Sequence, residues 1–207
     1  MKSFLIANPK GGSGKSTLAT NLAGYFAQSG AQVMLGDIDR QQSSREWLKI
    51  RPEELPPIRG WSAEKDQPLR PPKDATHVVL DTPAGLHGKA LEKALRQVSK
   101  VIVPVQPSLF DILATRDFLE ILLQEKAVRK EKTFVAVVGM RVDSRTRSAG
   151  ELERFLSSWD LPVLGHVRDS QLYVQLAASG MTLFDLPESR VSRDVEQWRP
   201  ILEWIER

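Results

Sequence analysis

A glycine-rich run near the N-terminus has the residue types that bind phosphate. Residues 8–17 read Asn-Pro-Lys-Gly-Gly-Ser-Gly-Lys-Ser-Thr, between an apolar stretch at 4–7 and a helical pattern that begins at Lys15. Glycines let successive backbone N–H groups point at phosphate oxygens, and a helix N-terminus adds partial positive charge. In such a loop the lysine, here Lys15, reaches the β- and γ-phosphates, and the next hydroxyl, here Ser16, binds Mg²⁺. The run predicts a nucleoside triphosphate site contacted by Gly11, Gly12, Ser13, Gly14, Lys15, Ser16 and Thr17.

Two acidic residues follow the next strand-like stretch. Asp37 and Asp39 come after the apolar run Gln32–Gly36. Side chains at i and i+2 of a strand end point the same way, so we expect both carboxylates to face the phosphate site. Asp39 has an alternative reading as a helix N-cap, because a helical pattern extends from it to Trp47.

A third acidic position ends another apolar run. Asp81 follows Val78, Val79 and Leu80. Burying a carboxylate at the end of such a strand costs free energy unless a cation lies nearby. We expect Mg²⁺, held through water, to be that cation, which makes the predicted metal set Ser16, Asp39 and Asp81.

The glycine-rich run departs from the general phosphate-loop pattern at its start. The pattern has a glycine five residues before its Gly-Lys pair, but this chain has Pro9 there, followed by a second lysine, Lys10. The resulting Lys-Gly-Gly-x-Gly-Lys-Ser-Thr resembles the deviant Walker ATPases of the ParA/MinD superfamily. The resemblance implies that Lys10 reaches across a dimer interface to the nucleotide of a partner copy. It also implies catalytic roles for Lys10, Lys15 and Asp39, the last of which orients or deprotonates the attacking water.

Further segments are similar to this family along nearly the whole chain. The segment 37–43 resembles its switch I, with Arg40 where proline is usual, and 81–85 resembles switch II. The segment 103–108 resembles a loop near the dimer face, although a simple turn with two prolines is equally compatible. The family reads adenine with an Asn-Lys or Asn-Arg pair; this chain has Met140-Arg141, so the resemblance assigns Arg141 alone, as a stacking guanidinium.

Apolar strand-like runs alternate with helical patterns along the chain. The pattern predicts an α/β fold, a single domain over residues 1–207, with a mostly parallel sheet flanked by helices on both faces. Strands are expected at Gln32–Gly36, His77–Leu80, Lys100–Val105 and Thr133–Val138, with a short one near Ile58–Trp61 inside a proline-rich stretch at 52–72. Helices are expected at Lys15–Ser29, Leu86–Val98, Asp111–Arg129, Ala149–Trp159, Gln171–Ala178 and Ser192–Glu206.

Bulk composition limits the remaining classes. The chain has 207 residues, 41% hydrophobic and 27% charged, with no cysteine, which excludes disulfides, thiolate metal sites and iron–sulfur ligation. No apolar run approaches the roughly 20 residues that span a bilayer, and no signal peptide precedes the first strand, so a soluble cytoplasmic protein is expected.

Positive charge is distributed unevenly although the net charge is only +3. Residues 126–147 hold seven cations against two anions. The spacing of Lys89, Lys93, Arg96 and Lys100 predicts one helix face. Both groups are compatible with solvated surfaces or with non-specific phosphate binding.

The resemblance implies an ATP- and Mg²⁺-dependent switch that dimerises with ATP. Its leading form is a short ParA-type ATPase for plasmid or chromosome partition, cytoplasmic and nucleoid-associated. It would bind DNA non-specifically and be stimulated by an adaptor of ParB type. DNA contact is expected at Arg145, Arg147, Arg190 and Arg193. The alternatives are the same ATPase positioning a protein cargo, or a MinD-like membrane switch. The membrane switch is disfavoured because charges balance along the apolar C-terminal segment, which reads as a core-packing helix.

Overall fold

The computed structural model describes residues 1–38, 42–61 and 74–207. Among them, seven strands form one sheet in the order β3-β2-β4-β1-β5-β6-β7, and every neighbouring pair is parallel. The strands are β1 (Lys2–Ile6), β2 (Val33–Asp37), β3 (Ile58–Trp61), β4 (His77–Asp81), β5 (Lys100–Val105), β6 (Phe134–Met140) and β7 (Val163–Val167). This confirms the predicted parallel sheet.

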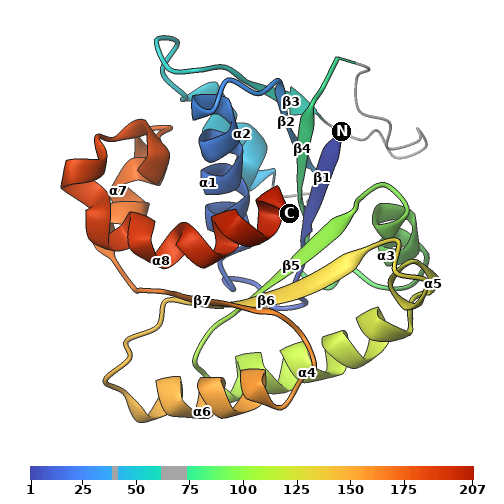
Figure 1. Cartoon of the computed structure of the whole chain (residues 1–207). Coiled ribbons are helices and arrows are strands. Elements are labelled where there is room, and N and C mark those ends of the chain that lie inside the picture. The colour runs from blue at the N-terminus through green and yellow to red at the C-terminus, as the bar shows by residue number, and fades with distance from the viewer. Residues whose placement is uncertain (39–41, 62–73) are drawn as a thin grey trace.

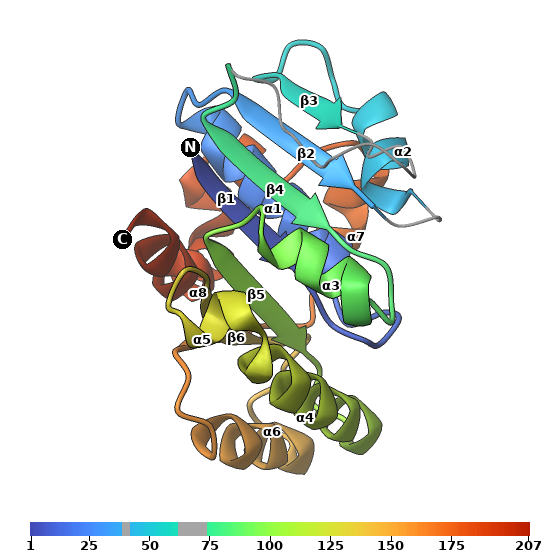
Figure 2. The same cartoon turned by 90° about the vertical axis from the view of Figure 1, so that its right-hand side faces the viewer.

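Helices cover both faces of the sheet (Figures 1 and 2). One layer holds α1 (Lys15–Gln28), α2 (Ser43–Lys49), α7 (Gln171–Ala178), the 3₁₀ turn η1 (Leu183–Asp185) and α8 (Glu188–Glu206). The other layer holds α3 (Gly88–Leu95), α4 (Leu109–Gln124), α5 (Lys126–Arg129) and α6 (Arg147–Ser157).

The strand pattern explains why two cores form. In β1, Phe4 and Ile6 lie in the core under α1 and α8, whereas Leu5 lies in the core under α3 and α4. Successive side chains of a strand point to opposite faces, so an uninterrupted apolar strand supplies both cores at once.

The sheet register gathers the polar strand ends at one edge. Ile6 of β1 pairs with Asp81 of β4, and Asp81 pairs in turn with Asp37 of β2. Both acids therefore end beside the loop that leaves β1, which is where ligands bind in open parallel sheets.

Two expectations about elements are wrong in detail, and one strand was not predicted. The long helix predicted at Asp111–Arg129 breaks, because Glu125 is extended (φ −62°, ψ 137°) and separates α4 from α5. Lys100 does not continue a helix face with Lys89, since the chain turns after Arg96 and Lys100 begins β5. Strand β7 was not predicted, because Gly165 and half-buried His166 interrupt its apolar pattern.

The C-terminal helix packs in the core, as predicted. Trp198, Ile201 and Ile205 of α8 are fully buried. Lys100 anchors the last turn, since its Nζ donates a 2.6 Å hydrogen bond to the Trp204 carbonyl and lies 4.8 Å from the indole centroid. Within the part of the chain that the structure describes, no helix combines the length and apolar character needed to cross a membrane.

Candidate nucleotide-binding site

The loop between β1 and α1 curls around an open space, with glycines where its backbone is left-handed. Gly14 caps α1 at φ 97°, and Gly12 has φ 77°. A Cβ built on Gly14 would lie 3.1–3.4 Å from the side chain of Met140. Only glycine combines this conformation with so close a neighbour, so the loop can present its N–H groups inward.

A buried asparagine, which the sequence analysis missed, anchors this loop. Asn8 is 2% exposed; its Nδ2 donates to the Pro104 carbonyl at 2.7 Å and to Thr115 Oγ1 at 2.9 Å. Its Oδ1 accepts from the Lys10 N–H at 2.8 Å. The side chain of Gln106 also donates to the Gly12 carbonyl. Strand β5, helix α4 and the loop are thereby fixed to one another, a link across about a hundred residues that local spacing does not reveal.

The two lysines of the loop lie differently. Lys15 is 7% exposed, and its Nζ donates to the Lys10 carbonyl at 2.7 Å and lies 3.4 Å from Ser13 Oγ. Its ammonium therefore spans the loop where phosphates are expected to sit. The Lys10 side chain is half-buried at the loop, and no ion pair or side-chain hydrogen bond links its ammonium to a described residue.

Asp81 is a buried and perturbed carboxyl of the site. It is 1% exposed; Ser44 Oγ donates to its Oδ2 at 2.6 Å, while buried Oδ1 has no hydrogen-bond partner among the described residues. Burial raises the pKa of Asp81 to about 6, opposed by the Ser44 and Ser16 hydroxyls and by Lys15, and aided by the charge of Asp37. A carboxylate with one unpartnered oxygen, in a site that disfavours its charge, is suited to a cation.

The donor set around Asp81 fits Mg²⁺. The Ser16 hydroxyl lies close to Asp81, and Asp37 is the next acid along the strand ends. Mg²⁺ prefers oxygen donors and is usually held by one or two carboxylates, waters and substrate phosphates. No group of three His, Cys, Asp or Glu residues converges on a metal position in residues 1–38, 42–61 and 74–207. Ser16 and Asp81 thus lie close together, and their role as Mg²⁺ ligands stays a prediction.

Helix α2 joins the acids of two strands. Beside the Ser44 contact to Asp81, the Arg45 N–H donates to Asp37 Oδ2 at 3.1 Å. Ser44 was not predicted as a site residue, since its only signal in the sequence is a hydroxyl shortly after an acidic strand end. Asp39, the predicted water-positioning residue, and Arg40 lie outside the described residues, so the role of Asp39 stays a prediction.

Two adjoining cavities meet at the loop. One, of about 880 Å³, is lined by the glycine-rich loop together with Ile38, Ser43 and residues 83–85. The other, of about 450 Å³, is lined by Met140, Tyr173, Val174 and residues 167–171. Gly14, Thr17 and Arg141 line both cavities, and Arg141 has φ 55°. The first cavity suits phosphates, and the second offers apolar walls with polar edges that suit a base. Arg141 lies where the two cavities meet, and its contact with a nucleotide stays a prediction.

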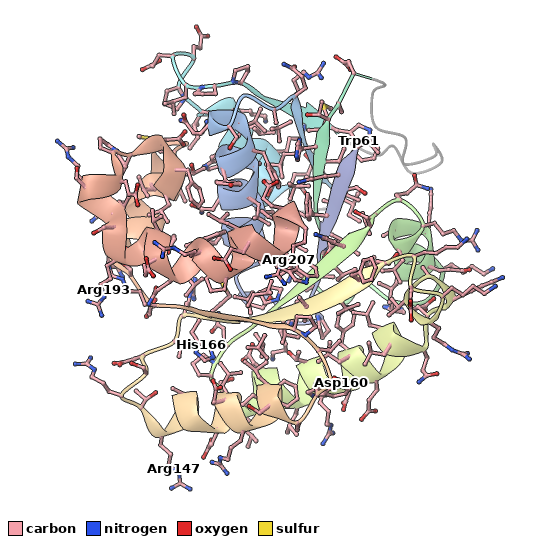
Figure 3. All side chains as sticks on the ribbon, in the orientation of Figure 1. Trp61, Arg147, Asp160, His166, Arg193 and Arg207 are labelled. Carbon is pink, nitrogen blue, oxygen red and sulfur yellow. The ribbon has the colours of Figure 1, made fainter. Side chains whose placement is uncertain are left out.

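The four arginines expected to contact DNA do not form one patch. Arg147 begins α6 and Arg193 lies on α8, helices on opposite faces of the sheet (Figure 3). Arg145 and Arg147 are already paired, with Asp143 at 2.8 Å and Glu151 at 3.3 Å. Arg190 and Arg193 are exposed on α8 without an ion pair to a described residue.

Comparison with known proteins identifies the class. The family described as the CobQ/CobB/MinD/ParA nucleotide binding domain matches residues 4–183. The chain belongs to this family, and its fold is that of the ParA/MinD nucleotide-binding ATPases.

Individual relatives differ in how much of the chain they match. The "Maintenance of carboxysome distribution protein A" of Halothiobacillus neapolitanus is 26% identical over 189 residues, which cover 87% of this chain and 86% of that protein. The "Chromosome-partitioning ATPase Soj" of Thermus thermophilus is 37% identical, but over 98 residues, 45% of this chain and 37% of Soj.

Solved structures share the fold at low identity. A putative plasmid partition protein of Borrelia burgdorferi, bound to AMPPNP, superposes with a TM-score of 0.72 at 19% identity, covering 98% of each chain. The septum site-determining protein MinD of Pyrococcus horikoshii, complexed with Mg-ADP, has a TM-score of 0.69 at 16% identity, covering 95% of this chain and 93% of that one.

Proposed function

We propose that this chain is a Mg²⁺-dependent ATPase that works as a switch: ATP joins two copies, hydrolysis separates them, and the cycle positions a protein assembly. The observation that carries the proposal is the pair of loop lysines. Lys15 lies across its own loop, while the ammonium of Lys10 has no ion pair with a described residue at the same loop. Two such cations suit a triphosphate that is bound in the loop of one copy and is also contacted by Lys10 of the second copy.

Each residue of the site then has a physical task. Backbone N–H groups of residues 11–14 and the Lys15 ammonium hold the phosphates, and Ser16 with water-linked Asp81 would hold Mg²⁺, which neutralises phosphate charge when bound. Arg141 would stack on the base. Asp39 would position the attacking water, and Lys10 of the second copy would stabilise charge on the γ-phosphate as an arginine finger does.

An exposed apolar turn supports association near the loop. Leu109 and Phe110, at the start of α4, are 60% and 73% exposed. They follow directly on the segment 103–108, whose Gln106 contacts Gly12. Exposed large apolar side chains beside a functional loop are typical of protein interfaces, so this turn is a candidate contact between the two copies.

The comparisons also bear on which cargo the ATPase would position. From the sequence, plasmid or chromosome partition is the leading expectation and a protein cargo is the alternative. The relative named for carboxysome distribution matches across almost the whole chain, whereas the Soj match covers less than half of it. The longer match favours a protein assembly as cargo. Partition, with a ParB-type adaptor, is the second candidate, and both would use non-specific DNA, for which α8 offers Arg190 and Arg193.

A membrane switch is not favoured. The apolar residues of α8 that a membrane anchor would need, Trp198, Ile201 and Ile205, are buried in the core. We therefore propose a cytoplasmic, nucleoid-associated protein. Co-sedimentation with anionic liposomes in the presence of ATP would overturn this assignment.

The test compares Lys10→Ala with Lys15→Ala. Size exclusion, nucleotide binding, hydrolysis and DNA binding are measured with ATP, with ADP and without nucleotide. Lys10→Ala is expected to bind ATP nearly as the wild type does but to lose hydrolysis that depends on dimers, whereas Lys15→Ala is expected to lose ATP binding. Full turnover by Lys10→Ala would refute the role of the second copy, and a chain that stays monomeric with ATP would refute the switch.

A further inference from the structure

A separate cavity lies at the opposite end of the sheet from the two cavities at the nucleotide loop. It has a volume of about 430 Å³ and lies between α3 and α5, where β5 and β6 begin. Its floor is formed by Leu95, Val98 and Ala127. Figure 1 draws α3 and α5 beside each other, across the sheet from α1 and α2. The proposed nucleotide chemistry uses none of its residues.

The rim of this cavity carries an excess of positive charge. Lys126, Lys130 and Lys132 line it and are exposed, and none of them forms an ion pair within the described ranges 1–38, 42–61 and 74–207. Of the two carboxylates on the wall, Glu92 is already paired with Arg96, which leaves Glu125. Three lysines thus face one unpaired carboxylate.

The chain path explains why the lysines gather there. Glu125 is extended and ends α4, so that Lys126 begins a separate short helix instead of continuing the longer one. Glu131 then adopts φ 54°, and the turn brings both Lys130 and Lys132 onto the cavity wall. Thr133 closes the turn by donating to the carbonyls of Leu95 and Val98, at 3.3 and 3.1 Å. The carbonyls of Leu95 and Val98 at the floor are therefore hydrogen-bonded, whereas the three ammonium groups at the rim have no ion-pair partner among the described residues.

We propose that this cavity docks an acidic segment of a partner protein, with one apolar side chain on the floor and carboxylates on the three lysines. Because the rim is positively charged, charge complementarity favours a negatively charged partner. The shape of the cavity favours a protein segment over DNA, because the lysines surround a hollow with an apolar floor. The backbone of a DNA duplex presents phosphates on a convex surface and no apolar side chain to fill such a floor, whereas acidic motifs are recognised by clustered cations around pockets. The site is independent of the proposed ATPase cycle.

The probe is a fluorescein-labelled peptide of alternating Glu and Asp with one central Leu, and the readout is fluorescence anisotropy with the full chain at low ionic strength. Lys126→Glu combined with Lys130→Glu should weaken binding by about tenfold or more, because each change replaces an attraction with a repulsion. Arg190→Glu with Arg193→Glu, a control with the same change of net charge on α8, should leave peptide affinity within about twofold of wild type. The peptide without Leu should bind more weakly, and a peptide with Lys at each acidic position should not bind.

Several results would overturn the proposal. They are absence of saturable binding to the wild type, equal losses in both double variants, or equal affinity with and without Leu. A DNA duplex is the second probe. If the Lys126/Lys130 variant loses DNA affinity but keeps the peptide, the surface binds nucleic acid and the acidic-segment proposal fails. Unchanged melting of both variants excludes unfolding as the cause.

Discussion

Ser44 Oγ donates a 2.6 Å hydrogen bond to Asp81 Oδ2, which joins the helix after β2 to the carboxyl at the end of β4. The bond is buried and spans 37 residues of sequence. It lowers the pKa of Asp81 against the larger effect of burial. The ionisation of the predicted Mg²⁺ ligand therefore depends on the position of α2, the helix that follows the predicted switch I.

Ser44→Ala tests this link. Without the hydroxyl, the pKa of Asp81 should rise further, and the free energy of unfolding should fall by about 1–3 kcal/mol because a buried acceptor loses its donor. A carboxyl ¹³C titration and urea denaturation measure the two effects. The neighbouring Ser43→Ala, at an exposed position, is the matched control and should change neither. An unchanged Asp81 titration in Ser44→Ala would contradict the link.

Asp81→Asn should stabilise the nucleotide-free protein, because it removes the cost of burying the ionised carboxylate of Asp81. The pKa of Asp81 is raised from 3.8 to about 6 in the folded protein. Between pH 3.8 and 6 the unfolded chain therefore binds fewer protons at this carboxyl than the folded protein does. As a result, the free energy of unfolding falls as the pH rises through this range. At pH 7 the variant without nucleotide should be more stable than the wild type by roughly 3 kcal/mol, with the difference vanishing below pH about 4. It should also lose Mg²⁺-dependent ATP affinity. Parallel stability curves for the two proteins from pH 4 to 7 would show that Asp81 is ionised normally.

Gly14→Ala should disrupt the loop. Alanine at φ 97° is strained, and its Cβ would meet Met140 at 3.1 Å, so we expect a loss of about 2 kcal/mol in stability together with ATP binding. Gly150→Ala is a control of opposite sign. It lies within α6 with no atom within 4 Å of an added Cβ, and it should stabilise by about 0.5–1 kcal/mol. Thermal melting and fluorescent-ATP titration measure both, and retained ATP affinity in Gly14→Ala would contradict the predicted loop geometry.

Arg51→Ala should be strongly destabilising, because it removes one partner of a buried ion pair. Its guanidinium makes two hydrogen bonds of 2.9 and 3.0 Å to Asp185, and the two side chains are 5% and 0% exposed. Although burial alone would raise the pKa of Asp185, hydrogen bonds from Arg51, Gln28 and Thr182 lower it. Removing Arg51 leaves a buried carboxylate unpaired and should cost about 3–5 kcal/mol at neutral pH.

The sign of the pH effect distinguishes this cause from lost packing. A depressed carboxyl pKa stabilises the fold above the unfolded pKa, and that contribution is lost as pH falls. The deficit of Arg51→Ala should therefore shrink in acid, where Asp185 is protonated. Arg59→Ala, which breaks an exposed pair with Asp74, should cost less than about 1 kcal/mol. A deficit that does not shrink as the pH falls from 7 to well below 3.8, through the lowered pKa of Asp185, would favour lost packing.

Much of the fold could be predicted because the determining patterns are local. The mostly apolar run 100–105 is short and rich in valine and isoleucine, which is typical of a strand buried on both faces. Residues 10–17 are typical of a phosphate loop by their types and order. Strand β7 was missed because glycine and histidine interrupt its pattern, and the break at Glu125 was missed because no proline or glycine marks it. The prediction that Lys100 shares a helix face with Lys89, Lys93 and Arg96 was wrong, because helical spacing was extended past the end of α3.

The sequence by itself determined the phosphate-binding loop, the parallel sheet and the acidic residues at its strand ends, because these depend on backbone preferences and short-range spacing. Only the tertiary structure decided which distant groups meet. Asn8 donates hydrogen bonds to Pro104 and Thr115, and Ser44 donates one to Asp81. Three lysines line one cavity, namely Lys126, Lys130 and Lys132. Such contacts arise from the order of strands and the turns between elements, and the burial that perturbs Asp81 exists only once the sheet and its helices have assembled.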